Sequence, residues 1–240
     1  MNKSLSFYGR EKEVEQLRQL YADHRNALIV GAPGIGKTAL VRHVRQVCPM
    51  LLCEETSSLR RICDSLEREL GWRHYKLNVI ERKNRLIEYL SRRGEVVVFD
   101  HVALTPPRVA RFVAHLIERI PVWIVCRSTL AADIGRVWEY LVNFVRIEMQ
   151  PLTADETRVL VEASAEGGHI QADARAHDSQ LHRMSKGNPR VLEELLIELA
   201  ARNYEMNSNF GRQLLDLDRR IHELDLAGDG TPVASLPFHE

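Results

Sequence analysis

Residues 27–41 read ALIVGAPGIGKTALV, and this stretch decides what the rest of the chain is expected to build. Four apolar residues predict a short buried strand at its start, and the pattern after Lys37 predicts a helix. Between them lies Gly31–Thr38, a Gly-x-x-x-x-Gly-Lys-Thr loop in the strand–loop–helix context that this phosphate-binding motif requires. We expect all three glycines of the loop to adopt positive φ and to turn backbone N–H groups inward.

The loop predicts a site for a nucleoside triphosphate. The helix that starts near Lys37 directs its positive dipole end at the same point, which favours bound phosphate. Lys37 is expected to reach the β- and γ-phosphates, and the Thr38 hydroxyl to bind Mg²⁺. The alternative is a glycine-rich turn that matches the motif by chance. The residues expected to contact the nucleotide here are Gly31, Ala32, Pro33, Gly34, Ile35, Gly36, Lys37, Thr38 and Ala39.

Length and composition are those of a soluble globular protein. The chain has 240 residues, enough for one α/β domain and a small second one, and a formal net charge of zero. Any polyanionic partner must therefore meet a local basic patch. The four cysteines form no metal-ligand spacing and are expected to be buried free thiols. No apolar run approaches membrane-spanning length, so we expect a cytoplasmic protein with no membrane partner.

The first 150 residues alternate between apolar runs and helical patterns, which predicts an α/β core with a parallel sheet. Each apolar run is short and is followed by residues typical of turns or helix starts. The expected strands are residues 27–30, 49–53, 95–100, 121–125 and 143–149, and one of the expected helices is 130–141.

Asp100 ends the apolar run at 95–100, where P-loop enzymes carry the residue that binds the Mg²⁺ water shell. We therefore expect Thr38 and Asp100 to form the metal site. The next residue is His101, whose neutral imidazole can accept a proton but supplies no fixed negative charge.

After Gln150 the pattern becomes purely helical, which predicts a small helical domain over residues 151–204. Thr153 and Glu156 form a capping box at its first helix. The expected helices are 153–165, 177–185 and 189–203, with breaks at Gly167–Gly168 and Gly187–Pro189. Residues 205–240 are expected to hold one more helix, over 210–226, and a disordered acidic tail.

Two further motifs extend the pattern beyond the loop. Phe7-Tyr8-Gly9-Arg10-Glu11 precedes it, and Gly187-Asn188-Pro189-Arg190 starts the last helix of the second domain. With the loop and Asp100, they resemble the AAA+ and STAND ATPases, including replication initiators and transposition regulators. The resemblance implies an ASCE-type P-loop fold with strand order 5-1-4-3-2 and a helical lid, and ATP or ADP with Mg²⁺.

The resemblance also implies roles for single residues. Tyr8 and Arg10 would lie beside the adenine base, although a simple N-terminal cap packed on the sheet is the alternative. Arg127, after the fourth strand, would sense the γ-phosphate unless it forms an ordinary surface ion pair. Pro189 and Arg190 would bring the lid to the nucleotide. Arg136 is a weaker candidate for the arginine finger that reaches the nucleotide of a neighbouring subunit, and a solvent-facing arginine is the alternative.

The chain departs from this family at two points. AAA+ enzymes usually place Glu after the strand-end Asp, whereas this chain has His101, so hydrolysis is expected to be slow. Glu54 and Glu55, after the second strand, are candidate substitutes because neighbouring strand ends converge. No winged-helix or repeat sequence follows the lid.

Residues 60–93 carry ten Lys/Arg against five Asp/Glu, with Trp72 and Tyr75 among them. This pattern is compatible with nucleic-acid contacts and base stacking, or with ordinary solvated helix faces and core aromatics. The candidate contacts are Arg60, Arg61, Arg82 and Lys83.

Three functions follow from these features. The leading hypothesis is an ATP-dependent assembly switch that forms a homo-oligomer in the ATP state and engages a protein or DNA. The second is a nucleotide-binding scaffold that hydrolyses nothing. The third is direct nucleic-acid handling by the basic surface.

Overall fold

The computed structural model describes residues 9–73, 76–166, 176–202, 204, 206 and 208–228. The chain divides into two compact units, with the passage from one to the other between Gln150 and Pro151. The expected roles of Tyr8 and Tyr75, the break at Gly167–Gly168 and the tail after Gly228 lie outside the described residues.

The first unit is built on a five-stranded parallel sheet in the order β2-β3-β4-β1-β5. This arrangement confirms the predicted strand order 5-1-4-3-2. The strands are β1 Ala27–Val30, β2 Met50–Cys53, β3 Val96–Val102, β4 Val122–Cys126 and β5 Val145–Glu148. The helices are α1 Glu11–Ala22, α2 Lys37–Val44, α3 Leu59–Glu69, α4 Val79–Arg93, α5 Pro107–Ile117, α6 Ala131–Ile134 and the 3-10 helix η1 Arg136–Tyr140.

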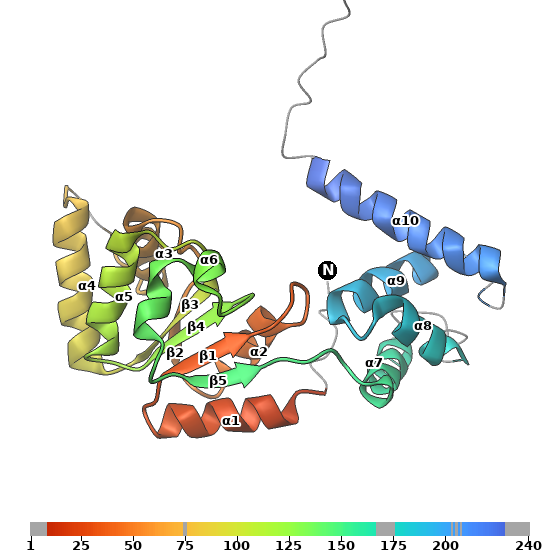
Figure 1. Ribbon diagram of the computed structural model, residues 1–240, viewed down its shortest axis with the longest axis horizontal. Helices are drawn as coiled ribbons and strands as arrows, with labels where there is room; N and C mark the ends of the chain where they lie inside the picture. The colour runs from red at the N-terminus through yellow and green to blue at the C-terminus, as the bar shows by residue number, and fades with distance from the viewer. Residues whose placement is uncertain are drawn as a thin grey trace, which may run out of the picture. The chain divides into compact units, whose positions relative to one another are not determined.

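Helices cover both faces of this sheet, which explains why its central strands are apolar throughout. Alternate residues of β1 show the two faces: Leu28 packs with α3, α4 and α5, whereas Ile29 packs with α1 and α2. Figure 1 shows α3, α4 and α5 together on one side of the sheet and α1 on the other. The result is a three-layer α/β/α unit whose carboxyl strand ends share one edge.

The predicted helix over residues 130–141 is wrong. Gly135 interrupts it with φ +70° and forms a parallel bridge with Thr105, so that α6 and η1 are separate elements. A Cβ at Gly135 would lie 2.4 Å from the Thr105 backbone nitrogen. The close approach requires glycine at this position, and the sequence pattern of residues 130–141 does not predict it.

The second unit contains α7 Ala154–Glu166, α8 Asp178–Ser185, α9 Pro189–Ala201 and α10 Asn209–Gly228. Its core is formed by buried aliphatic residues, among them Val161, Leu181, Leu192 and Leu215. The predicted capping box is confirmed: the Thr153 N–H donates to Glu156 Oε2 at 2.7 Å, and the Glu156 N–H donates to Thr153 Oγ1 at 3.2 Å.

Candidate nucleotide site

The glycines of the loop at residues 31–38 are required for two different reasons. Gly34 and Gly36 adopt φ +77° and +96°, in the region that other residues avoid. Gly31 does not, so its predicted positive φ is wrong. It is needed for space instead, because a Cβ there would lie 2.9 Å from Ile35 Cγ2 and 3.1 Å from the Met149 carbonyl oxygen. Met149 follows β5 and has no sequence signal for this role.

Backbone N–H groups of the loop are available to an anion. Within the part of the chain that the structure describes, the N–H groups of Gly34, Gly36, Lys37 and Thr38 have no protein acceptor. They surround the first turn of α2, where the helix dipole also favours negative charge. The donor set therefore fits a phosphate group.

Lys37 folds back over the loop. Its Nζ donates to the carbonyl oxygens of Gly31 at 2.7 Å and Ala32 at 2.9 Å. Burial lowers the pKa of Lys37, and the nearby carboxylate of Asp100 opposes that shift. The positive charge of Arg127 lowers the pKa of Lys37 further, which indicates that both cations belong to one site.

Thr38 and Asp100 meet beneath the loop. The Thr38 hydroxyl donates to Asp100 Oδ2 at 2.7 Å, although the two residues are 62 positions apart. Asp100 is fully buried, and its Oδ1 accepts the His101 N–H at 2.8 Å. A hydroxyl and a carboxylate are oxygen ligands of the kind that Mg²⁺ takes alongside water and phosphate oxygens. The described residues contain no cluster of three or more His, Cys, Asp or Glu side chains that could hold a metal by itself.

His101 lies near the end of β3, where the register shifts between Phe99 and Val102, and it has φ +54°. Its side chain is 70% exposed, and its Nε2 lies 3.6 Å from Asp100 Oδ2. The imidazole is therefore open to solvent beside the buried carboxylate. The candidate substitutes Glu54 and Glu55 instead pair with arginines, Glu54 with Arg42 at 2.7 Å and Glu55 with Arg61 at 3.0 Å.

Arg127 follows β4, the neighbour of β3 in the sheet. Its side chain is exposed, and among the described residues it forms no ion pair or hydrogen bond. An unpaired arginine next to Lys37 and Asp100 can accept an additional anion without breaking an existing interaction.

Arg10 is buried and joins three segments. Its guanidinium donates to the carbonyl oxygens of Ile35 at 3.4 Å and Gln150 at 2.7 Å, and pairs with Glu13 at 3.2 Å. It therefore ties the N-terminal segment and the end of the core to the loop. Sequence reasoning missed this supporting role.

The loop after β3 is tied to the segment after β4. The Thr105 hydroxyl donates to the Ile134 carbonyl oxygen at 2.6 Å and accepts the Val137 N–H at 3.1 Å. Arg136 lies in this segment with its side chain exposed, and it pairs with Glu139 at 2.8 Å.

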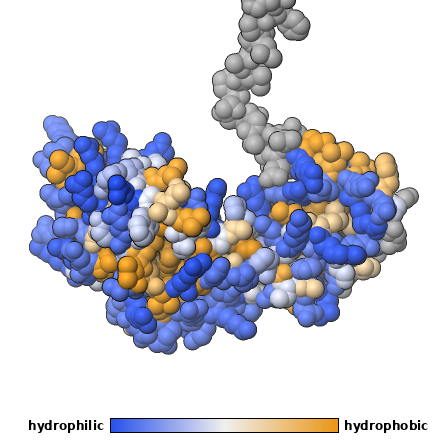
Figure 2. Space-filling model, viewed as in Figure 1, coloured by the Kyte–Doolittle hydropathy of each residue, from blue (hydrophilic) through white to orange (hydrophobic). Residues whose placement is uncertain are grey.

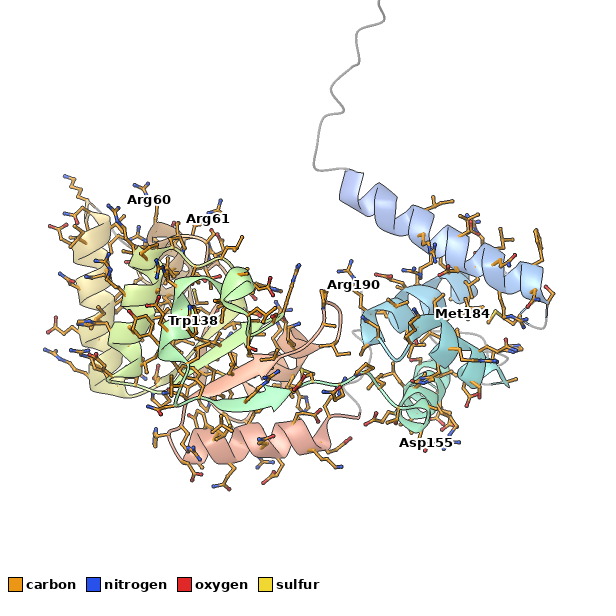
Figure 3. All side chains as sticks on the ribbon, viewed as in Figure 1. Arg60, Arg61, Trp138, Asp155, Met184 and Arg190 are labelled. Carbon is orange, nitrogen blue, oxygen red and sulfur yellow. The ribbon has the colours of Figure 1, made fainter. Side chains whose placement is uncertain are left out.

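Pro189 and Arg190 start α9 in the second unit. The Asn188 side chain caps this helix by accepting the Arg190 N–H at 3.1 Å. The Arg190 guanidinium is exposed and donates to Glu194 at 2.9 Å (Figure 3). Gly187, with φ +71°, is required by its close approach to Leu152, whose N–H donates to the Gly187 carbonyl oxygen at 2.8 Å.

The predicted nucleic-acid contacts do not share one environment. Arg60 and Arg61 are exposed at the start of α3 (Figure 3). Lys83 is half-buried. Arg82 is a correction: it is buried, and its guanidinium donates to Glu67 and Asp64 between α3 and α4. Trp72 packs edge-on against Tyr89 under the Arg85 guanidinium, so it is a core-edge aromatic.

Comparison with known families agrees with this geometry. The model of the AAA ATPase domain family matches residues 6–205. The chain belongs to this family. It is an ATP-binding P-loop protein of the AAA+/STAND type.

Solved structures share the fold of this AAA ATPase domain. The Orc1 protein of Aeropyrum pernix, solved in complex with DNA, is 19% identical with a TM-score of 0.67, over 95% of this chain and 70% of that one. A Walker-type ATPase of Pyrococcus abyssi is 15% identical with a TM-score of 0.62, over 94% of this chain and 77% of that one. A Pyrococcus horikoshii STAND protein with a tetratricopeptide repeat sensor is 15% identical with a TM-score of 0.52, over 87% and 32%.

No helix among the described residues of this AAA ATPase domain has both the length and the apolar character needed to cross a membrane.

Proposed function

We propose that this AAA ATPase domain is a Mg-ATP-dependent switch that hydrolyses ATP slowly. The observation that carries the proposal is the Thr38–Asp100 pair beneath the phosphate loop, followed by an exposed histidine where hydrolytic relatives have glutamate. Bound Mg²⁺ would neutralise charge on the phosphates. The protein itself supplies free N–H groups, the Lys37 ammonium and the unpaired Arg127 guanidinium around them.

Each side chain has a defined task in this switch. The Lys37 ammonium exchanges two backbone carbonyl oxygens for phosphate oxygens, and Asp100 holds the Thr38 hydroxyl in place. We propose that Arg127 and Arg190 contact the γ-phosphate from the core and the lid, with Pro189 starting the lid helix. Arg136 would reach the nucleotide of a neighbouring copy in the ATP-bound homo-oligomer.

His101 explains why turnover is expected to be slow. A carboxylate at this position would attract a proton from the attacking water with a fixed negative charge. The imidazole has no such charge when neutral, and its exposed position leaves the water unrestrained. We therefore propose that the protein acts on its partner during a long-lived ATP-bound state.

Steady-state ATPase measurements on three variants test the switch. We expect slow turnover in the wild-type protein, no further loss in His101→Ala, and faster turnover in His101→Glu. Lys37→Ala is the control for contaminating ATPase, because it should lose nucleotide binding. Fast wild-type turnover that persists in His101→Ala would contradict the proposal.

The second candidate is a scaffold that binds nucleotide without hydrolysis, which the absent glutamate also favours. Chromatography of the nucleotide released from the protein separates the two functions. ADP that accumulates after incubation with ATP, and is lost in Lys37→Ala, would eliminate the scaffold.

Direct DNA binding is favoured by the exposed Arg60 and Arg61 and by the relative solved with DNA. The binding constant should fall steeply with salt, and each neutralised phosphate contact should reduce the logarithmic slope by about 1. Arg60→Ala, Arg61→Ala and Lys83→Ala test this, with Arg119→Ala as a matched control outside the basic region. A binding constant that is independent of salt would refute it.

A further inference from the structure

Helix α10 carries an exposed apolar stripe that the switch does not use. The stripe consists of Phe210, Leu214, Leu217 and Ile221, which are 74%, 38%, 54% and 47% exposed. Figure 2 shows this apolar surface over α10. The spacing of four, three and four residues is the seam of a left-handed coiled coil, and it continues through the described side chains of the 20-residue helix.

The opposite face of α10 is held on its own unit. Leu215 is fully buried, and Asp218 accepts hydrogen bonds from Arg202 at 2.7 Å and Tyr204 at 2.8 Å. Arg219 donates to Glu194 of α9 at 3.0 Å. Because these contacts fix the rotation of the helix about its axis, the stripe cannot turn inward without breaking them.

We propose that a second copy of this chain covers the stripe, with the two α10 helices antiparallel. In that orientation Phe210 lies opposite Ile221 of the second copy, and Leu214 lies opposite Leu217. Every stripe residue then meets a stripe residue: the larger Phe210 opposes the smaller Ile221, and leucine opposes leucine. The second copy would be a partner of the proposed switch, so the inference adds to that function. The contact between the two α10 helices itself requires no nucleotide.

Charge favours the antiparallel orientation. Among the described side chains, the exposed positions beside the stripe are Asn209, Gln213 and Arg220, and Arg220 pairs with Asp216 of its own helix at 2.7 Å. Antiparallel pairing sets the two Arg220 residues nine residues apart along the axis, about 13 Å at 1.5 Å per residue. That separation exceeds the Debye length of ~10 Å at 0.1 M salt. Parallel pairing would set the two guanidinium groups level with one another.

The size of the stripe sets the expected affinity. The four side chains expose on the order of 400 Å² per copy, so a dimer buries roughly 800 Å², below the ~1,200 Å² lower bound of standard interfaces. We therefore expect a weak, concentration-dependent dimer that exchanges rapidly. Such a contact suits reversible assembly.

Sedimentation equilibrium on the full chain without nucleotide tests the dimer. We expect the average mass to rise toward the dimer with concentration, and the dissociation constant to increase at least tenfold in Leu217→Glu or Leu214→Lys. A mixture of these two variants should recover dimer, because residues 214 and 217 face each other across the seam. Ile197→Glu, on the exposed side of α9, is the matched control and should leave the mass unchanged.

Cysteine cross-linking tests the orientation, and the four native cysteines are buried enough to give a low background. A mixture of Phe210→Cys and Ile221→Cys should form a disulfide-linked dimer under air oxidation, whereas Phe210→Cys alone should not. A protein that stays monomeric at ~0.5 mM, near the weak end of measurable affinities, would overturn the proposal. A dimer insensitive to the stripe variants, or one cross-linked by Phe210→Cys alone, would also overturn it. Nucleotide binding is measured separately, so none of these failures bears on the switch.

Discussion

Arg82 was predicted to be a nucleic-acid contact, but the structure buries it in an ion pair, and the variant Arg82→Ala tests this burial. Its guanidinium Nε lies 3.1 and 3.0 Å from the two carboxylate oxygens of Glu67. The side chains of Arg82 and Glu67 are 6% and 2% exposed. Removal of the arginine leaves the Glu67 carboxylate buried without its main counter-charge.

The expected cost follows from that burial. Breaking a buried ion pair by removing one partner costs about 3–5 kcal/mol, because the remaining charge stays desolvated. For a chain of this size 1 kcal/mol lowers the Tm by roughly 2–4 °C, so Arg82→Ala should lower it by about 6–20 °C. Thermal unfolding followed by circular dichroism measures the shift.

Two controls separate burial from charge. Arg92→Ala removes an exposed i,i+4 pair with Glu88 on the same helix, which should cost well under ~1 kcal/mol. The double variant Arg82→Met/Glu67→Leu removes both buried charges and should recover most of the lost stability. If Arg82→Ala loses less than about 1 kcal/mol, or weakens DNA binding while Tm is unchanged, the assignment of Arg82 to the interior is refuted.

Three further predictions concern the core. In chemical denaturation, Gly135→Ala should lower the free energy of unfolding by more than the ~1 kcal/mol expected for Gly71→Ala. Both glycines have positive φ, but only Gly135 meets a neighbouring backbone, and equal losses would contradict that role. In isothermal titration calorimetry, Thr38→Ala should weaken ATP binding in the presence of Mg²⁺ and leave binding in EDTA nearly unchanged, because the hydroxyl acts through the metal. Thr38→Ser keeps the hydroxyl and should retain the Mg²⁺ dependence. An equal loss of affinity in EDTA would argue against metal binding by Thr38. Burial raises the pKa of Cys126 to about 11 and that of Cys53 to about 12, since it disfavours the thiolate. A thiol reagent at pH 8 should therefore label these residues only after unfolding, and rapid labelling of the folded protein would show that they are accessible.

Local sequence patterns predicted the elements of the core well because they depend on neighbouring residues. Local patterns placed all five strands, and the continuous apolar run of β3 indicated burial on both faces. The strand–loop–helix motif located Gly31–Thr38, and the Thr153–Glu156 capping box located the first helix of the second unit. Each of these signals lies within one short continuous stretch of the chain.

Close approaches between distant segments could not be predicted in this way. The predicted helix over 130–141 failed because Gly135 packs against Thr105, 30 positions earlier. Positive φ at Gly31 was also a wrong prediction, since the constraint there is the backbone of Met149. Each case is decided by which atoms lie within a few ångströms, and that depends on the sheet order.

By itself, the sequence determined that this chain binds a phosphate-bearing ligand on a parallel sheet, because spacing and residue type control local backbone geometry. Only the tertiary structure decided which charged side chains are free to bind a ligand and which are paired within the protein. It paired Thr38 with Asp100, buried Arg82 between carboxylates, turned Arg10 into a support of the loop and left Arg127 unpaired. The physical reason is desolvation: a charged side chain has the same chemistry everywhere in the sequence, but its energy depends on the partners and water that folding leaves around it.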